Sequence, residues 1–148
     1  MTRVDFYILP DGAPSGRETF ACRLADIAYR RGQRVYVYAQ SQDQARALDK
    51  LLWTFQAGSF VPHELHPSEA AAVTPILIGH EGVPDSGHEV LINLAASVPN
   101  FFSRFERVAE VLNQEPSVKQ AGRERFRFYR ERGYALETHT LTAQMDNA

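Results

Sequence analysis

The stretches PILIGH (75–80) and VLINLA (90–95) decide the fold class. Both are short and almost wholly apolar, as expected for strands that are buried on both faces of a sheet. The upstream sequence supplies the other parts, because the ranges 3–9 and 34–40 favour strands and the ranges 17–32 and 41–55 favour helices. The order strand, helix, strand, helix and then buried strands predicts an α/β domain with a largely parallel central sheet.

The remaining segments extend this prediction. The range 60–66 is expected to hold a short edge strand, since Pro62 cannot donate to a sheet, and the alternating range 135–141 predicts a last strand at an edge. Helices are expected to be capped by Ser41 and Ser117 at their N-termini and by Gly32 and Gly133 at their C-termini. The range 99–113 favours a helix, although its segment RVAEVL is equally compatible with a strand. Residues 1–142 are predicted to form one domain and 143–148 a frayed tail.

Composition narrows the class of protein. A chain of 148 residues with 44% hydrophobic residues suits a single domain with its own core. No apolar run approaches the roughly 18 residues of a membrane span, and Asp5 interrupts the N-terminal apolar stretch, which is too short for a secretory signal. Cys22 is the only cysteine, so an internal disulfide is impossible. Together these features predict a cytoplasmic protein with no membrane partner.

No familiar catalytic motif is present. Gly12 and Gly16 in LPDGAPSGRETF match neither a dinucleotide-binding fingerprint nor a phosphate-binding P-loop, so this segment is predicted to be a turn that opens a helix. The nucleophile motif G-x-S-x-G is absent, and Cys22 has no adjacent histidine, which indicates a small buried hydrophobic residue. We therefore predict no catalytic residue, no nucleotide site and no cofactor.

The histidines give only weak metal signals. His63 and His66 of HELH would point the same way on a helix, but Pro62 and the strand-like context oppose a helix. The 80–89 loop places two histidines near three acidic residues, a set compatible with a hard metal or a general base: His80, Glu81, Asp85, His88 and Glu89. A solvated loop is the favoured interpretation, and no metal site is predicted.

The segment KQAGRERFRFYRERGY (119–134) concentrates charge. Residues 119–132 hold six basic and two acidic side chains, a net charge of +4, which leaves −6 for the rest of a chain whose total is −2. On a helical wheel the core stripe consists of Val118, Ala121, Phe128 and Tyr129, and a second arc about 60° wide contains Lys119, Arg123, Phe126 and Arg130. Because a solvated strip has no need of Phe126, this arc is interpreted as a binding surface; an exposed helix with an incidental phenylalanine is the alternative. Arg125 falls inside the core stripe and is expected to snorkel or to pair with a carboxylate.

A second surface is suggested by the helix at 41–55. Trp53 lies about 100° from the edge of its core face, and Phe60 follows in a predicted loop. Tryptophan is enriched at interface hot spots, so this pair is a candidate contact patch. Burial of both side chains under later strands is the alternative.

These pieces, in this order, resemble the chi subunit of bacterial DNA polymerase III, an accessory protein of the clamp-loader complex. The most specific matches are LDKLLW, SFVPH and KQAGRERFRFYRERGY, and weaker matches extend the resemblance over nearly the whole chain, up to about residue 142. The resemblance implies a single α/β domain with a Rossmann-like sheet, no nucleotide site, no catalysis of its own, and a strand at RVAEVL.

The resemblance also implies two partners. The psi subunit, which connects chi to the clamp loader, would contact Trp53 and Phe60. The acidic C-terminal tail of single-stranded DNA-binding protein, which ends in phenylalanine, would contact Lys119, Arg123, Phe126 and Arg127, so contact with DNA would be mostly indirect. Phe126 replaces the usual tyrosine, which removes a hydroxyl. Gly122 is a second departure and costs up to about 1 kcal/mol relative to alanine in a helix.

The sequence alone leaves two alternative functions possible. The basic strip could meet the phosphates of single-stranded nucleic acid, although a lone basic helix on a body of charge −6 would bind DNA weakly. The 80–89 loop could belong to an enzyme.

Overall fold

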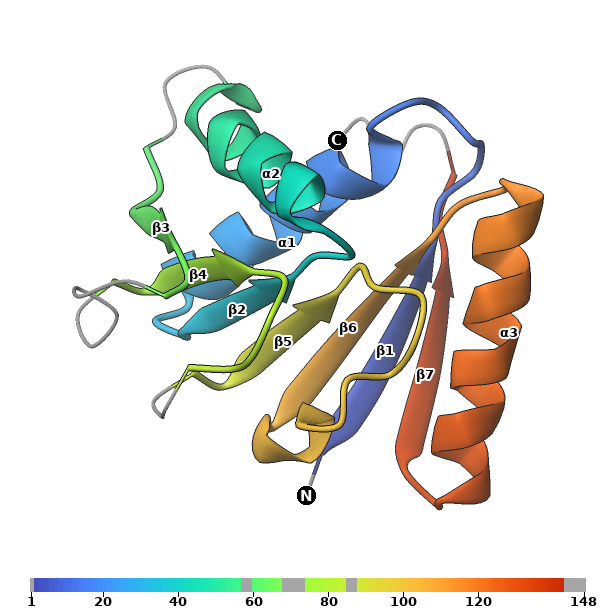
Figure 1. The fold of residues 1–148 in the computed structure, drawn as a ribbon. Helices are drawn as coiled ribbons and strands as arrows, with labels where there is room; N and C mark the ends of the chain where they lie inside the picture. Colours follow the sequence, from blue (N-terminus) through green and yellow to red (C-terminus); the bar gives the residue numbers. More distant parts are fainter. Residues whose placement is uncertain (1, 57–59, 68–73, 85–87, 143–148) are drawn as a thin grey trace.

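Seven parallel strands form one sheet in the order β3-β4-β2-β5-β6-β1-β7 (Figure 1). The computed structural model describes residues 2–56, 60–67, 74–84 and 88–142. The strands are β1 (Arg3–Ile8), β2 (Val35–Tyr38), β3 (His63–Leu65), β4 (Ile76–Gly79), β5 (Val90–Asn93), β6 (Arg107–Leu112) and β7 (Ala135–Thr140). The predicted α/β class with a Rossmann-like sheet is confirmed, and every described strand pair is parallel.

The two apolar stretches that predicted the class form β4 and β5, on either side of β2. Every residue of both strands is buried. Their side chains alternate between two apolar clusters, one on each face of the sheet: Ile76, Ile78 and Ile92 join the first cluster, and Leu77 and Leu91 join the second. An unbroken apolar run is therefore what a strand needs when both of its faces are covered.

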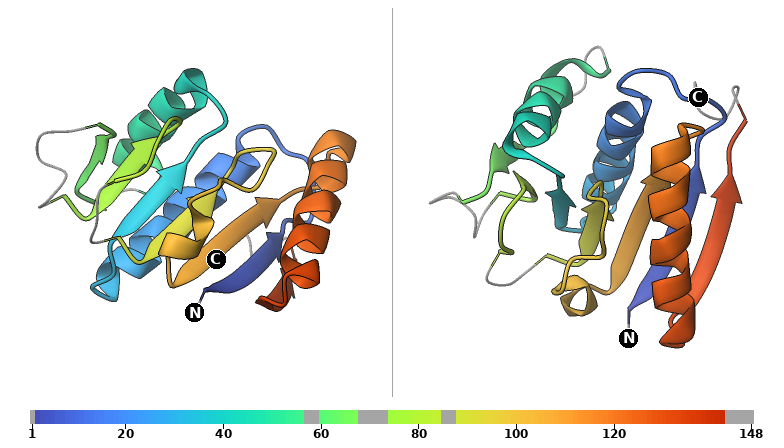
Figure 2. Two further views of the ribbon diagram at one scale, coloured as in Figure 1. Left: turned by 60° about the horizontal axis from the view of Figure 1, so that its bottom comes forward. Right: turned by 45° about the vertical axis from the view of Figure 1, so that its right-hand side comes forward.

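Helices cover both faces. Helix α1 (Gly16–Arg30) and helix α2 (Gln42–Thr54) lie together on one face, and α3 (Pro116–Glu131) lies on the other (Figures 1 and 2). Ser41 caps α2 as predicted, because its hydroxyl accepts a hydrogen bond from the Gln44 amide at 3.1 Å. Ser117 was wrongly predicted as the cap of α3, since Pro116 already occupies the first helical turn and Glu115 precedes it. Gly133 follows α3 with a φ of 78°, a left-handed conformation that favours glycine.

The segment 99–113 is mostly not helical. A short 3₁₀ helix spans Phe102–Arg104, and RVAEVL forms strand β6, as the resemblance implied and against the helical preference of the local pattern. The three aromatic residues that suggested a helical face, Phe101, Phe102 and Phe105, are buried in the cluster on the α3 side of the sheet. The chain between β5 and β6 crosses this face without a long helix, so these aromatic side chains cover the sheet there instead of a helix.

The edge strands are the predicted ones. Strand β3, directly after Pro62, is three residues long, and β7 closes the opposite edge beside β1. The predicted tail, residues 143–148, lies outside the described residues.

None of the helices in the described part of the chain is long and apolar enough to cross a membrane.

Candidate functional site

The basic surface predicted on the last helix lies along α3 and is called here the α3 strip: Lys119, Arg123, Phe126 and Arg127. Arg123 and Arg127 are exposed, whereas Lys119 and Phe126 are half-buried. The Lys119 ammonium group donates to Gln114 Oε1 at 3.3 Å, so it is held near the start of the helix. The strip therefore offers two exposed guanidinium groups and one positioned ammonium group along about two helical turns.

Phe126 joins this strip to the core. Its ring packs edge-on against Phe6 of β1, with 5.2 Å between the ring centroids. The argument that a solvated strip has no need of Phe126 was therefore wrong, because the ring has a packing role of its own. The ring is only half-buried, so part of it stays accessible on the same helix as the basic side chains.

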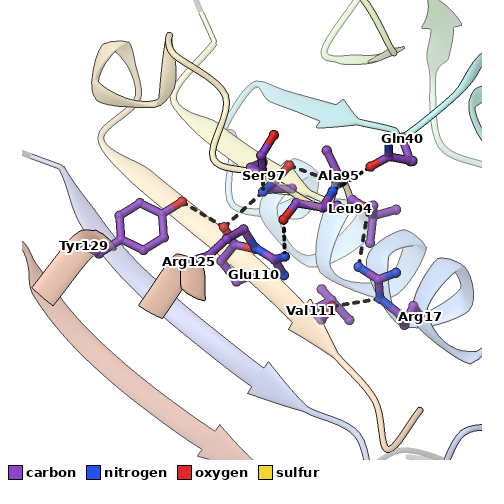
Figure 3. A network of polar contacts seen from close by, with 11 residues as sticks. Arg17, Gln40, Leu94, Ala95, Ser97, Glu110, Val111, Arg125 and Tyr129 are labelled. Atoms are coloured by element: carbon purple, nitrogen blue, oxygen red, sulfur yellow. Dashed lines mark hydrogen bonds and ion pairs between the residues drawn. The ribbon is translucent and has the colours of Figure 1, made fainter. Parts of the chain in front are cut away.

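A buried polar network ties α3 to the sheet. Glu110 of β6 is completely buried and accepts hydrogen bonds from Arg125 Nε (2.9 Å), the Tyr129 hydroxyl (2.8 Å) and Asn93 Nδ2 (3.0 Å) (Figure 3). Arg125 also donates to the Ala96 carbonyl at 2.8 Å, which ties α3 to the loop after β5. The expectation that Arg125 pairs with a carboxylate is confirmed. Burial, reinforced by Glu110, raises the pKa of Tyr129 far above its ordinary value, so this hydroxyl stays a donor.

Gly122 faces Leu112 of β6 at close range. A Cβ atom at this position would lie 2.6 Å from both Cδ atoms of Leu112, well inside contact distance. The glycine thus has a packing reason that the helix pattern alone could not reveal. The missing side chain allows α3 to pack closely on Leu112 of β6.

We expect Gly122→Ala to lower the free energy of unfolding by about 1 kcal/mol. Overpacking against Leu112 costs about 1–3 kcal/mol, and the better helix propensity of alanine recovers up to about 1 kcal/mol. Urea denaturation measures the difference. The Leu112→Ala background is the control, because it removes the clash and should make the same substitution stabilising. An equal effect of Gly122→Ala in both backgrounds would contradict the packing explanation.

The aromatic pair predicted on α2 is exposed. Trp53 keeps 52% and Phe60 keeps 65% of its surface accessible, and their ring centroids are 5.4 Å apart. Burial under later strands, the alternative explanation for both residues, is wrong. Two large rings in mutual contact and in contact with water form an apolar surface that a partner could cover.

His63 supports this patch from below. Its ring centroid is 4.6 Å from that of Trp53, and the side chain is buried. The two ring nitrogens face the Val61 carbonyl at 2.6 Å and the Asp49 carbonyl at 2.9 Å. His63 therefore joins β3 to α2 and fixes the floor on which Trp53 rests.

The two surfaces lie at opposite ends of the sheet. The Trp53–Phe60 patch stands beside β3, the first strand in the spatial order, and the α3 strip stands beside β1 and β7, the last two. Figure 2 shows α2 and α3 at opposite ends of the sheet.

Among the described residues, the remaining candidates predicted from the sequence give no assembled site. His66 follows a strand rather than a helix, so HELH does not present two histidines on one helical face. Residues 85–87 of the 80–89 loop lie outside the described residues. One acidic and histidine cluster that sequence inspection missed brings together Asp5, Glu137 and His139, but Asp5 already accepts from Arg107 at 2.8 Å and contacts His139 at 3.1 Å.

Cys22 is buried as predicted. Its burial, together with the nearby charge of Glu18, raises the pKa of the thiol to about 12, so the thiol is protonated near neutral pH. This residue acts as a small hydrophobic group in the cluster between α1 and the sheet.

Comparison with known proteins gives consistent matches. The family model described as DNA polymerase III chi subunit, HolC matches residues 1–137. The DNA polymerase III subunit chi of Pseudomonas aeruginosa is 45% identical over 95% of this chain and 98% of its own length, and that of Escherichia coli is 33% identical over 95% and 99%. Among solved structures, T4 UvsW is similar in fold alone, with a TM-score of 0.70 and 10% identity over 95% of this chain and 41% of that one.

Proposed function

The chain belongs to the DNA polymerase III chi subunit family, and on this premise we propose that it is a non-catalytic adaptor which links the psi subunit to single-stranded DNA-binding protein. Membership makes it a component of the DNA polymerase III holoenzyme that acts in DNA replication. The observation that carries the adaptor role is the presence of two separated surfaces of different chemistry. One is aromatic and exposed, and the other is basic with an aromatic border.

The α3 strip suits the tail of single-stranded DNA-binding protein, which in the resemblance is acidic and ends in phenylalanine. Guanidinium groups bind carboxylates through two parallel hydrogen bonds. Arg123 and Arg127 are exposed, so a carboxylate of the tail can reach both guanidinium groups. The accessible part of Phe126 offers an apolar neighbour for the terminal side chain. Burial of that side chain contributes about 1.5–3 kcal/mol before ordering costs are subtracted.

The Trp53–Phe60 patch suits the psi subunit. Exposed aromatic residues that pack on a rigid support lose little side-chain freedom on binding, and His63 supplies such a support. Occupation of this patch would leave α3 free for the second partner.

Direct binding of single-stranded DNA is the second candidate function. The observation in its favour is the pair of exposed arginines on α3 beside an aromatic ring, which resembles the combination of charge and stacking used by such proteins. The half-buried position of Phe126 argues against it, since a base needs an open ring face for stacking.

Arg123→Ala is expected to weaken binding of a synthetic tail peptide at least tenfold, about 1.4 kcal/mol, because it removes a charge-assisted contact. Isothermal calorimetry at two salt concentrations measures this, and affinity should fall as salt rises. Arg46→Ala on α2 is the matched control, since Arg46 is also exposed but lies elsewhere. Psi binding should be unchanged.

A peptide of the same composition in scrambled order separates the two candidate functions. The adaptor proposal requires that the native tail, with its terminal phenylalanine, bind much more tightly than the scrambled one. Equal affinities would show that α3 is a general polyanion site and would favour direct binding of nucleic acid.

A further inference from the structure

A cavity of ≈ 290 Å³ opens at the carboxyl edge of the sheet, on the side of α3 away from the strip. Its wall, completed by apolar side chains, combines residues from the starts of helices, from the loops after β2 and β5 and from the middle of α3: Arg17, Gln40, Gln44, Ala96, Ser117 and Arg125. We propose that this carboxyl-edge cavity binds a small oxyanion, specifically a phosphate group. The inference does not depend on the adaptor function, because neither partner surface contributes to the cavity.

Arg17 supplies a positive charge without a paired carboxylate among the described residues. Its guanidinium group donates from Nε to the Val111 carbonyl at 2.9 Å and from Nη2 to the Leu94 carbonyl at 3.4 Å (Figure 3). Both acceptors are uncharged. Burial first, and repulsion from Arg125 second, lower the pKa of Arg17, and the attraction of Glu18, Glu110 and Glu115, none of which forms an ion pair with it in the described part of the chain, does not reverse this shift.

Arg125 supplies an unused donor. Its Nε and Nη1 atoms are bound to Glu110 and to the Ala96 carbonyl, but Nη2 is buried and has no hydrogen-bond partner in the described part of the chain. The side chain as a whole is only 3% exposed. Such an unsatisfied buried donor costs free energy unless a ligand accepts its hydrogen bond. Glu110 pairs directly with Arg125, whereas Arg17 has no carboxylate at ion-pair distance among the described residues and can therefore contact a bound anion.

Backbone geometry adds to the attraction. Helices α1, α2 and α3 all begin at this edge, and free amide groups with partial positive charge occur at every helix N-terminus. The first turn of α3 has no acidic residue, although Glu115 precedes it, and Ser117 lines the cavity. Glu18 and Asp43 stand in the first turns of α1 and α2, but neither lines the cavity.

The cavity lies outside the carboxyl ends of the strands, where open parallel sheets commonly bind ligands. After β2 the chain enters α2 on one face, whereas after adjacent β5 it crosses the other face toward β6, so the two connections diverge and leave a crevice between them. The absence of a glycine-rich phosphate loop fits a site in which arginine side chains, rather than loop amides, provide most of the donors.

The first experiment titrates the ¹⁵N-labelled chain with inorganic phosphate at constant ionic strength and follows amide chemical shifts. Saturable shifts should centre on Ala95, Ala96, Ser117 and Val118, which surround the cavity. Shifts confined to residues around Arg123, or shifts that do not saturate, would overturn the proposal. This readout uses the unaltered protein, so it does not depend on whether a variant folds.

The second experiment compares Arg17→Met with Arg46→Met. Loss of the Arg17 charge should weaken phosphate binding at least about tenfold, equivalent to ~1.4 kcal/mol, whereas Arg46→Met on exposed α2 should leave it unchanged. Arg123→Ala should also leave it unchanged. Equal phosphate affinity in Arg17→Met and the unaltered chain would overturn the site.

A third arm distinguishes the source of the phosphate group. Adenosine monophosphate that binds at least tenfold more tightly than inorganic phosphate, with the same amides shifted, would identify a nucleotide as the source and would overturn the sequence-based prediction that the chain has no nucleotide site. Equal affinities would identify free phosphate. Failure of both at the carboxyl-edge cavity would reject the proposal while leaving the adaptor function intact.

Discussion

Arg125→Met is expected to lower the free energy of unfolding by about 3–5 kcal/mol, the loss typical when one partner of a buried ion pair is removed. Glu110 would remain completely buried with its charge uncompensated, held only by the hydrogen bonds from Tyr129 and Asn93. The bond from Arg125 to the Ala96 carbonyl would be lost as well. Urea denaturation followed by circular dichroism measures the change.

Two further variants show whether the buried charge is the cause. Arg127→Met, on the exposed side of the same helix, should change stability by no more than about 0.5 kcal/mol. The double variant Glu110→Met with Arg125→Met should recover much of the loss, because an apolar pair no longer leaves a charge in the interior. If Arg125→Met costs no more than Arg127→Met, the network does not hold α3 in place.

The pattern of apolar residues predicted the sheet but not this network. Arg125 stood out because a charged residue fell inside an apolar stripe, and that local contradiction correctly indicated a carboxylate partner. Glu110 gave no comparable signal, since a single acidic residue in RVAEVL is equally typical of an exposed strand position. Only the packing of α3 over β6 brings the two side chains to 2.9 Å.

Helical-wheel reasoning failed where the helix approaches the sheet. It gives the angle of each side chain about the axis but not the distance of the axis from its neighbours. Phe126 was therefore placed outside the core although it reaches Phe6, and Gly122 was interpreted as a cost although it permits contact with Leu112. Both errors concern depth, which depends on the residues of β1 and β6.

The carboxyl-edge cavity was missed for a different reason. Phosphate sites are recognised in sequence by glycine motifs, whereas this cavity is assembled from Arg17 and Arg125, which are 108 positions apart. A cation near the start of a helix is common and does not by itself indicate an anion site. The indication comes from the uncharged carbonyl groups that accept the hydrogen bonds of Arg17, and these contacts are visible only in the structure.

Trp53→Ala and Phe60→Ala are each expected to weaken psi binding by about 2 kcal/mol or more, roughly 30-fold, if they act as hot spots. Both rings are more than half exposed, so truncation removes surface that a partner would bury rather than surface that the fold already buries. Because the rings touch, the double variant should lose less than the sum of the two single losses. Calorimetry with purified psi measures all three.

Ile27→Ala supplies the matched control, because Ile27 is also a large hydrophobic residue, 47% exposed, but belongs to α1. It should bind psi normally. Tail-peptide affinity should be unchanged in every one of these variants, since the α3 strip lies at the other end of the sheet. Normal psi binding by both aromatic variants, with cooperative unfolding also unchanged, would show that psi docks elsewhere. A loss of cooperative unfolding would instead show that Trp53 serves mainly to cover His63, the buried residue that joins α2 to β3.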